Sequence, residues 1–314
     1  MLLHMMQQVV SYWLFLFHSM PTKIFLNKKN IGFNGGNYIS TQNVNVPPLL
    51  LNLFPGASAA YSLRKLDTTY AGSAIQVRRT SDNATQNIGF VNNVLDVAAL
   101  TTFLGANTGT VSIWYDQSGN GRNLINATAI EQPIVYAGGP VTFNGAPYFK
   151  LDGVDDRLVN SGFDPTNAGV LSTFTVALAA MSTLNTAVFL QQDQTAGSRI
   201  GQWARFSSGV SQSITFNTAQ ANFTANGSTV TNSVPYVYTT IRRPANVQSY
   251  VNGATGVSVA TTGTPIFNAA ATVYIGRRAT EALAGLMSEV VMYPLDQTTT
   301  RAAIEQNIRN YYGF

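Results

Sequence analysis

The 314-residue sequence predicts an all-β fold, an antiparallel β-sandwich of the jelly-roll kind with two short helices and an extended N-terminal arm. Only 10% of the residues are charged, whereas 45% are hydrophobic and 11% aromatic. This balance favours β-sheet over long surface helices, which need Glu and Lys. Many short segments alternate polar and apolar residues and are separated by Gly, Asn and Pro, as in a sandwich. No repeat of about 20–50 residues is visible, which argues against a propeller or a solenoid.

The chain divides into a predicted arm, residues 1–45, and a predicted sandwich domain, residues 46–314. Residues 1–19 are interpreted as an upstream extension, because Met20 begins the basic stretch MPTKIFLNKKN. The apolar patch at 9–17 is shorter than the ~20 residues of a membrane span, so we expect no span. A degenerate signal peptide is the alternative, although no Lys or Arg precedes the patch.

Two helices are predicted. The first covers 92–105, with Asn93 as N-cap and Gly105 as the stop, and the second covers 298–312, where Ile304, Ile308 and Tyr311 recur at helical spacing. The strands are expected in the alternating segments 73–79, 110–115, 172–181, 199–206, 212–217, 236–243, 246–253, 272–276 and 285–293.

Composition excludes several kinds of chemistry. The chain has no cysteine, so it can form no disulfide and no thiolate metal site. Its two histidines, His4 and His18, both lie in the predicted arm, which leaves the sandwich without an imidazole for a triad or a metal cluster. The net charge of +4 is spread along the chain in short pairs, so nucleic acid is not expected as a partner.

The stretch WYDQSGNGRN, residues 114–123, contains the opening positions of a calcium loop. Asp116, Ser118 and Asn120 precede Gly121, but Ala127 stands where the loop needs a bidentate Glu. The alternative is a glycine-rich turn in which Asp116 caps its own backbone. The missing ligand favours the turn, and no cofactor is expected, with calcium as the remaining alternative.

The segment KLDGVDDRLVN, residues 150–160, places Asp152, Asp155 and Asp156 at the entry to a strand. Such a cluster binds calcium, with Asp152 and Asp155 as candidate ligands, or supplies an acid/base pair. A polar turn built on Gly153 is the alternative, and turn chemistry favours it.

A candidate glycan-binding set lies on one face of RIGQWARF, residues 199–206, where alternation groups Arg199, Trp203 and Arg205. An indole stacks on the C–H face of a sugar, and guanidinium groups bind its hydroxyls. Arg277 completes the set. The alternative is that Trp203 faces the second sheet of the sandwich.

Two resemblances follow from these motifs. The stretch from AAYSLRKLDTTYAGSAIQVRRTSDNATQNIGF to VSIWYDQSGNGRNL resembles the first half of the catalytic domain of α-L-arabinofuranosidase B. From about residue 141 onward, LDGVDDRL, SYVNG, YIGRR and GLMSEVVMYP resemble the laminin-G-like, concanavalin A-like jelly roll. Together they cover about 50–314 and imply a single concanavalin A-like sandwich.

The resemblance implies a retaining glycosidase with two carboxyl groups, one as nucleophile and one as acid/base. The segment matching the family's nucleophile strand, QWARFSSG, holds Arg205 and Phe206 and no acid. After YIGRR, Glu281 is the only nearby carboxylate and a weak catalytic candidate, and the family's adjacent cysteine pair is missing. Glu289 lies in a strand shared with non-catalytic jelly rolls.

These departures predict a non-catalytic module that binds a surface polysaccharide or other glycan. By analogy of fold and composition, it would be a virion decoration or tail-fibre protein or a secreted adhesion protein, located on a virion surface or outside the cell. Residues 1–45 would anchor it to other virion proteins or to sister subunits in an oligomer. The alternatives are an arabinofuranosidase-like glycoside hydrolase with an altered site, using Glu281 or the Asp152, Asp155 and Asp156 group, and a purely structural capsid or fibre component.

Overall fold

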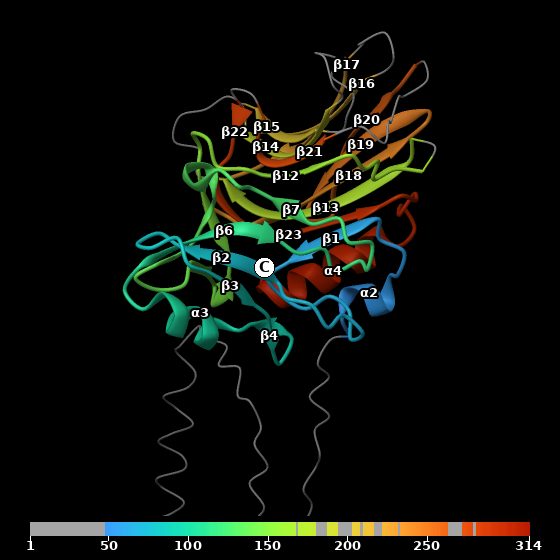
Figure 1. Cartoon of the computed structure of the whole chain (residues 1–314). Helices are drawn as coiled ribbons and strands as arrows, with labels where there is room; N and C mark the ends of the chain where they lie inside the picture. Colours follow the sequence, from blue (N-terminus) through green and yellow to red (C-terminus); the bar gives the residue numbers. More distant parts are fainter. Residues whose placement is uncertain are drawn as a thin grey trace, which may run out of the picture. The chain divides into compact units, whose positions relative to one another are not determined.

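A computed structural model describes most of the predicted sandwich domain (Figure 1). The described residues are 48–167, 169–179, 187–193, 203–207, 210–216, 222–231, 233–262, 272–278 and 281–314. The predicted arm lies outside these ranges, so the division at 45/46 and the partners assigned to the arm stay predictions. None of the helices within these ranges has the length and apolar character that crossing a bilayer requires.

The strands pair antiparallel in two courses. The first course, called the β23 sheet, has β1 and β11 along one side of β23 and continues from its other side through β13, β18 and β19 to β20. Its strands are β1 (Ala59–Ser62), β11 (Phe149–Asp152), β23 (Ala284–Tyr293), β13 (Leu171–Ala179), β18 (Tyr236–Arg243), β19 (Asn246–Val251) and β20 (Ala254–Ala260).

The second course, called the β21 sheet, runs from β17 through β16, β15, β14, β21, β12, β7, β6 and β2 to β3. Its strands are β17 (Asn222–Thr229), β16 (Val210–Phe216), β15 (Trp203–Ser207), β14 (Ala187–Asp193), β21 (Thr272–Arg278), β12 (Leu158–Ser161), β7 (Leu124–Ile125), β6 (Thr108–Trp114), β2 (Ile75–Arg79) and β3 (Thr85–Ile88). A further strand, β8 (Ile134–Ala137), pairs with both β6 and β11 and so joins the two courses.

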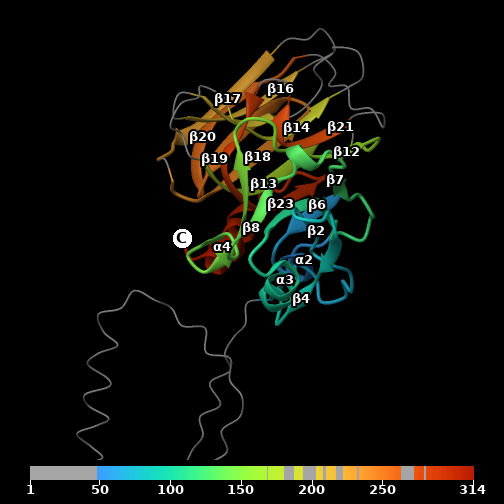
Figure 2. The same cartoon turned by 60° about the vertical axis from the view of Figure 1, so that its left-hand side comes forward.

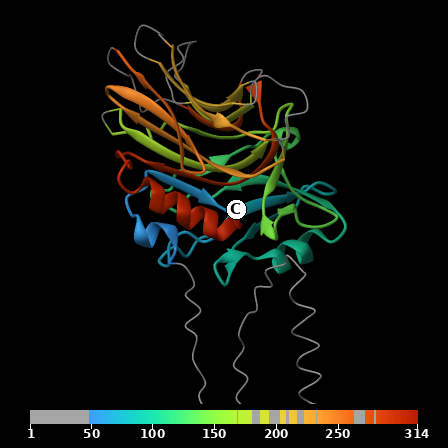
Figure 3. The same ribbon diagram turned by 180° about the vertical axis from the view of Figure 1, so that it is seen from behind.

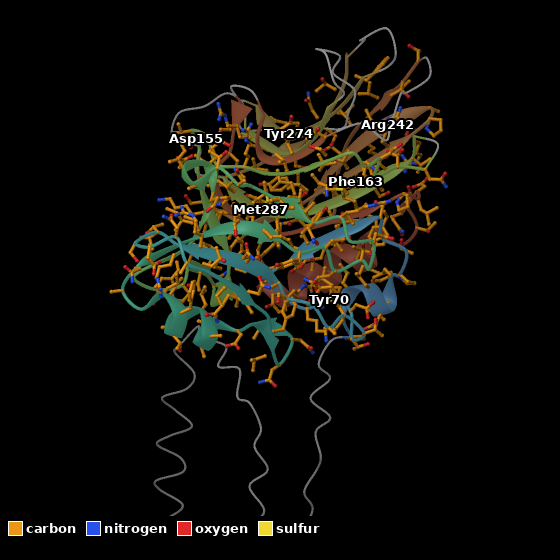
Figure 4. All side chains as sticks on the ribbon, in the orientation of Figure 1. Tyr70, Asp155, Phe163, Arg242, Tyr274 and Met287 are labelled. Atoms are coloured by element: carbon orange, nitrogen blue, oxygen red, sulfur yellow. The ribbon has the colours of Figure 1, made fainter. Side chains whose placement is uncertain are left out.

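The two sheets enclose the larger hydrophobic core. Met287 and Val290 of β23 pack in it with Trp114 of β6 and Ile275 of β21, all fully or almost fully buried. Figure 4 shows Met287 between the layers. Residues from strands far apart in the sequence therefore meet in one core, as the jelly-roll prediction requires. The predicted all-β sandwich is confirmed.

A second core lies on the other face of the β23 sheet, under α4 (Arg301–Tyr312) and α2 (Leu50–Leu53). Figures 1 and 3 show α4 along this face. Ile304 and Ile308 of α4 pack against Val291 and Tyr293 of β23. Because β23 is covered on both faces, its residues from Leu286 onward are almost all buried, and it is a central strand rather than an edge.

The helices differ from their predicted limits. The first, α3 (Val97–Leu104), is capped by Asp96, whose carboxylate accepts from the backbone N–H of Ala99, and not by Asn93, which sits in a tight turn with φ +66°. Gly105 is its C-cap, as predicted. Figure 2 shows α3 at the end of the β21 sheet near β2, and it contacts β3. The helix α2 was not predicted, because its four residues carry no periodicity.

The remaining short elements connect the sheets. They are β4 (Phe90–Val91), β5 (Val94–Leu95), η2 (Ala129–Glu131), β9 (Thr142–Phe143), β10 (Ala146–Pro147) and β22 (Glu281–Ala282). Of these, β22 matters most for the site, because it pairs with the end of β21 to form a hairpin.

Candidate functional site

The WYDQSGNGRN loop is a hydrogen-bonded turn in which Asp116 is saturated with donors. Its Oδ1 accepts from the backbone N–H groups of Ala60 and Ser118, both at 2.9 Å, and its Oδ2 accepts from the Ser118 hydroxyl and the Arg122 N–H. Gly119 and Gly121 take positive φ values of +84° and +70°. Four donors around one buried carboxylate stabilise its negative charge without a cation.

The same loop also fastens the preceding chain segment, through side chains that sequence reasoning did not single out. Gln117 accepts from the N–H of Leu66 and donates to the carbonyls of Ser62 and Arg64. Asn120, a weak calcium candidate, uses its amide to donate to the carbonyls of Ala57 and Ser58. The loop therefore ties β1 and its flanks to β6, which is a structural role.

A buried ion pair lies between the β23 sheet and α4. Arg64 donates to Glu289 through Nε at 2.7 Å and Nη2 at 2.9 Å, and neither side chain is more than 5% exposed. Ser62 and Tyr312 also donate to Glu289, and Arg64 donates to Asn307 of α4. Burial alone lowers the pKa of Arg64, but the adjacent Glu289 carboxylate outweighs it and raises the pKa above its usual value. Glu289 thus helps to hold α4 on the sheet.

The three aspartates of the 150–160 segment form a compact group. One carboxylate oxygen from each of Asp152, Asp155 and Asp156 lies within 4.8 Å of the others. The turn predicted on Gly153 is present: φ at Gly153 is +81°, and Asp152 Oδ1 accepts from the N–H groups of Val154 and Asp155. Asp156 Oδ2 accepts from the N–H of Asp152 at 2.8 Å.

The three carboxyl groups have different surroundings. Asp152 is exposed and Asp155 half-buried, whereas Asp156 is only 5% exposed. Burial raises the pKa of Asp156 to about 7, with the neighbouring charges of Asp152 and Asp155 adding to the effect and the N–H of Asp152 opposing it. A buried carboxyl group whose pKa is raised to near neutrality has a property expected of a general acid.

The turn packs against the hairpin that β21 forms with β22. In the register, Leu158 faces Ile275 and Asp152 faces Ala284, so the turn lies between the end of β21 and the start of β23. Glu281 lies in β22 opposite Arg278. The fold therefore brings the two alternative carboxylate sources, the aspartate group and the segment with Glu281, to one end of the sandwich. Figure 4 shows Asp155 at this end and Arg242 at the opposite one.

The candidate glycan-binding strand belongs to the same sheet. Arg205 of β15 pairs with Val188 of β14, and Val188 pairs with Gly276 of β21, so these three backbone positions form one row. Two strand spacings, about 10 Å, separate Arg205 from Gly276. Arg277 follows Gly276 and is half-buried. Arg199 and the side chains of Trp203, Arg205 and Glu281 lie outside the described parts, so their predicted roles stay predictions.

The family model of the catalytic domain of α-L-arabinofuranosidase B matches residues 54–141. A probable α-L-arabinofuranosidase B of Aspergillus clavatus and the α-L-arabinofuranosidase B of Aspergillus niger are each 34% identical to this chain over 103 residues, 29% of the chain. The chain covers about a fifth of the length of these relatives, 20% and 21% respectively.

Solved arabinofuranosidases share the fold over most of the chain. A GH54 α-L-arabinofuranosidase soaked with a cyclic sulfate inhibitor superposes with a TM-score of 0.62 at 17% identity, covering 84% of this chain and 64% of that one. An arabinofuranosidase complexed with arabinofuranosyl-α-1,2-xylobiose gives 0.62 at 19% identity with the same coverage. The chain is therefore an arabinofuranosidase-like β-sandwich.

The predicted non-catalytic binding module is wrong as the main interpretation, because the matching family model describes a catalytic domain and the curated relatives are α-L-arabinofuranosidases. The virion analogy likewise finds no support in these similarities. The prediction named the Asp152, Asp155 and Asp156 group as a possible acid/base pair but favoured a polar turn, and it found no acid in QWARFSSG and only Glu281 after YIGRR. Tertiary structure adds carboxyl groups to that end of the sandwich from the Asp152–Asp156 turn.

Proposed function

We propose that this chain is an arabinofuranosidase-like glycoside hydrolase domain that acts on an arabinose-bearing polysaccharide through an altered carboxylate site. The observation that carries the proposal is the match of the catalytic-domain model to residues 54–141, which include β1, β2 and β6 of the sandwich. Those strands build the core on which β21 and the aspartate turn rest. A polymeric substrate suits an extracellular location, which we propose with it.

In this proposal Asp156 is the general acid. Burial raises its pKa to about 7, and in its protonated form it would pass a proton to the leaving-group oxygen as the glycosidic bond breaks. Asp155 or Glu281 would act as the second carboxylate and attack the anomeric carbon or activate a water. Oxygens within 4.8 Å of one another in the aspartate group are close to the separation of about 5–5.5 Å that retaining enzymes use.

The test is release of nitrophenol from 4-nitrophenyl α-L-arabinofuranoside by the wild type and three single variants. We expect Asp156→Asn to lower kcat by about 100-fold or more, the usual contribution of a general acid. Glu281→Gln shows whether β22 supplies the second carboxylate. Asp82→Asn is the matched control, because Asp82 is an exposed acid paired with Arg79 on another turn. The proposal fails if the wild type releases no nitrophenol, or if Asp156→Asn is as active as the control.

A further inference from the structure

The aspartate turn is held against the β21–β22 hairpin by an unusually close contact at Gly276. Gly276 has φ +93°, and a Cβ built on it would overlap Cδ2 of Leu151 and lie 2.9 Å from the backbone oxygen of Asp156. The space beside Gly276 leaves no room for a methyl group, because Leu151 is itself buried in the core. Only glycine permits both this backbone conformation and this approach.

A second glycine makes the matching contact on the other side of the turn. A Cβ on Gly153 would lie 2.7 Å from Cβ of Ala284, the residue at which β23 begins. The hairpin between these two contacts is closed at its base, where the N–H of Leu283 donates to the carbonyl of Gly276 at 2.7 Å. The turn thus contacts Gly276 of β21 on one side and Ala284, which follows β22, on the other.

We propose that Gly276 is a positioning residue, which seats the Asp152–Asp156 turn against the β21–β22 hairpin and so sets the distance between Asp156 and the segment with Arg277 and Glu281. The catalytic meaning of this role rests on the proposed function. The contact involves the backbone of Asp156, whose side chain is buried while those of Asp152 and Asp155 are more accessible.

The experiment compares Gly276→Ala with Gly56→Ala. Gly56 has nearly the same conformation, φ +89°, but a Cβ there meets nothing within 4 Å, so it reproduces the backbone strain without the steric contact. Two quantities are measured, hydrogen exchange at the Asp152 amide, whose N–H is bonded to Asp156, and steady-state kinetics on 4-nitrophenyl α-L-arabinofuranoside.

We expect Gly276→Ala to speed exchange of the Asp152 amide by about tenfold or more, since the turn must move away from β21. We also expect kcat to fall by about 100-fold while KM changes less than about threefold, because a shift of about 1 Å misplaces the acid without removing the sugar-binding groups. Gly56→Ala should leave both quantities as in the wild type. Exchange and kcat equal to those of Gly56→Ala would overturn the proposal.

A second variant separates positioning from general damage. Adding Leu151→Ala to Gly276→Ala removes the side chain that the new methyl group would overlap, so exchange at Asp152 should return part of the way to wild type. The double variant also replaces the single one should Gly276→Ala fail to fold. No recovery in the double variant contradicts the proposal. If the wild type releases no nitrophenol, the proposed function fails, and the exchange data alone decide whether Gly276 positions the turn.

Discussion

Replacing Glu289 with Gln tests the buried ion pair that joins α4 to the β23 sheet. The substitution keeps the shape of the side chain but removes the charge that faces Arg64 through contacts of 2.7 and 2.9 Å. The glutamine NH₂ group would also face one of the groups that now donate a hydrogen bond to the carboxylate, namely Ser62, Tyr312 or Arg64. Arg64 would then be a buried cation left with Asn307 and the nearby aromatic rings.

Breaking a buried pair on one side costs about 3–5 kcal/mol. This is a large part of the roughly 5–15 kcal/mol by which domains are stable. The assay is urea unfolding followed by fluorescence, read as the free energy of unfolding of Glu289→Gln, Arg64→Met and the double variant. Removing both charges should cost less than the sum of the single variants, giving a coupling energy of about 2 kcal/mol or more.

Asp82→Asn is the control for this experiment, because it removes a charge from an exposed ion pair with Arg79. Exposed pairs contribute little to stability, so this variant should unfold like the wild type. The reasoning is refuted if Glu289→Gln unfolds like Asp82→Asn, or if the costs of Arg64→Met and Glu289→Gln simply add.

Three further predictions concern the carboxylates of the two loops. Asp116→Ala should cost about 3–5 kcal/mol in unfolding free energy, because it removes the acceptor for four hydrogen bonds, whereas a cost below about 1 kcal/mol would contradict its role as the centre of the loop. Burial raises the folded-state pKa of Asp156 to about 7, above the unfolded value of about 3.9. The contribution of Asp156 to the free energy of unfolding should therefore be greatest below pH 4 and should fall as the pH rises to 7. Asp156→Asn should flatten that dependence in melts from pH 4 to 8, and equal slopes for the two proteins would contradict it. A chelator should leave Tm unchanged, because Asp116 is already saturated by donors and Asp152 and Asp156 accept backbone N–H groups of their own turn, whereas a drop that added calcium reverses would show a cation site.

Local pattern predicted nine strand segments, but it did not predict other strands of the two sheets, such as β1, β11 and β12. Period-two alternation predicted β18 at its observed limits, β23 to within one residue and β19 to within two. Helix limits were less accurate, since Asn93 and Asp96 are both good N-cap residues and only the tight turn at Asn93 selects Asp96. The loop at Asp116 was correctly interpreted as a turn, because its Gly residues and Asp act through neighbours in the sequence.

The candidate site could be predicted only in part. The aspartate group was found because its three members lie within five residues, but the contact with Gly276 joins positions about 120 residues apart. No local signal marks that contact, since a glycine before two arginines looks like any strand end. Gln117 was missed for the same reason, as its three partners lie on the far side of a strand pairing.

The sequence by itself determined the fold class, part of the strand segments and the turn chemistry, all of which depend on residues close together in the chain. Tertiary structure alone decided that Glu289 serves Arg64, 225 positions away, and that the aspartate turn meets the hairpin with Glu281. The physical reason is register. Long-range strand pairing, set by how the two sheets bury their common core, selects which carboxylates meet a partner and which remain for chemistry.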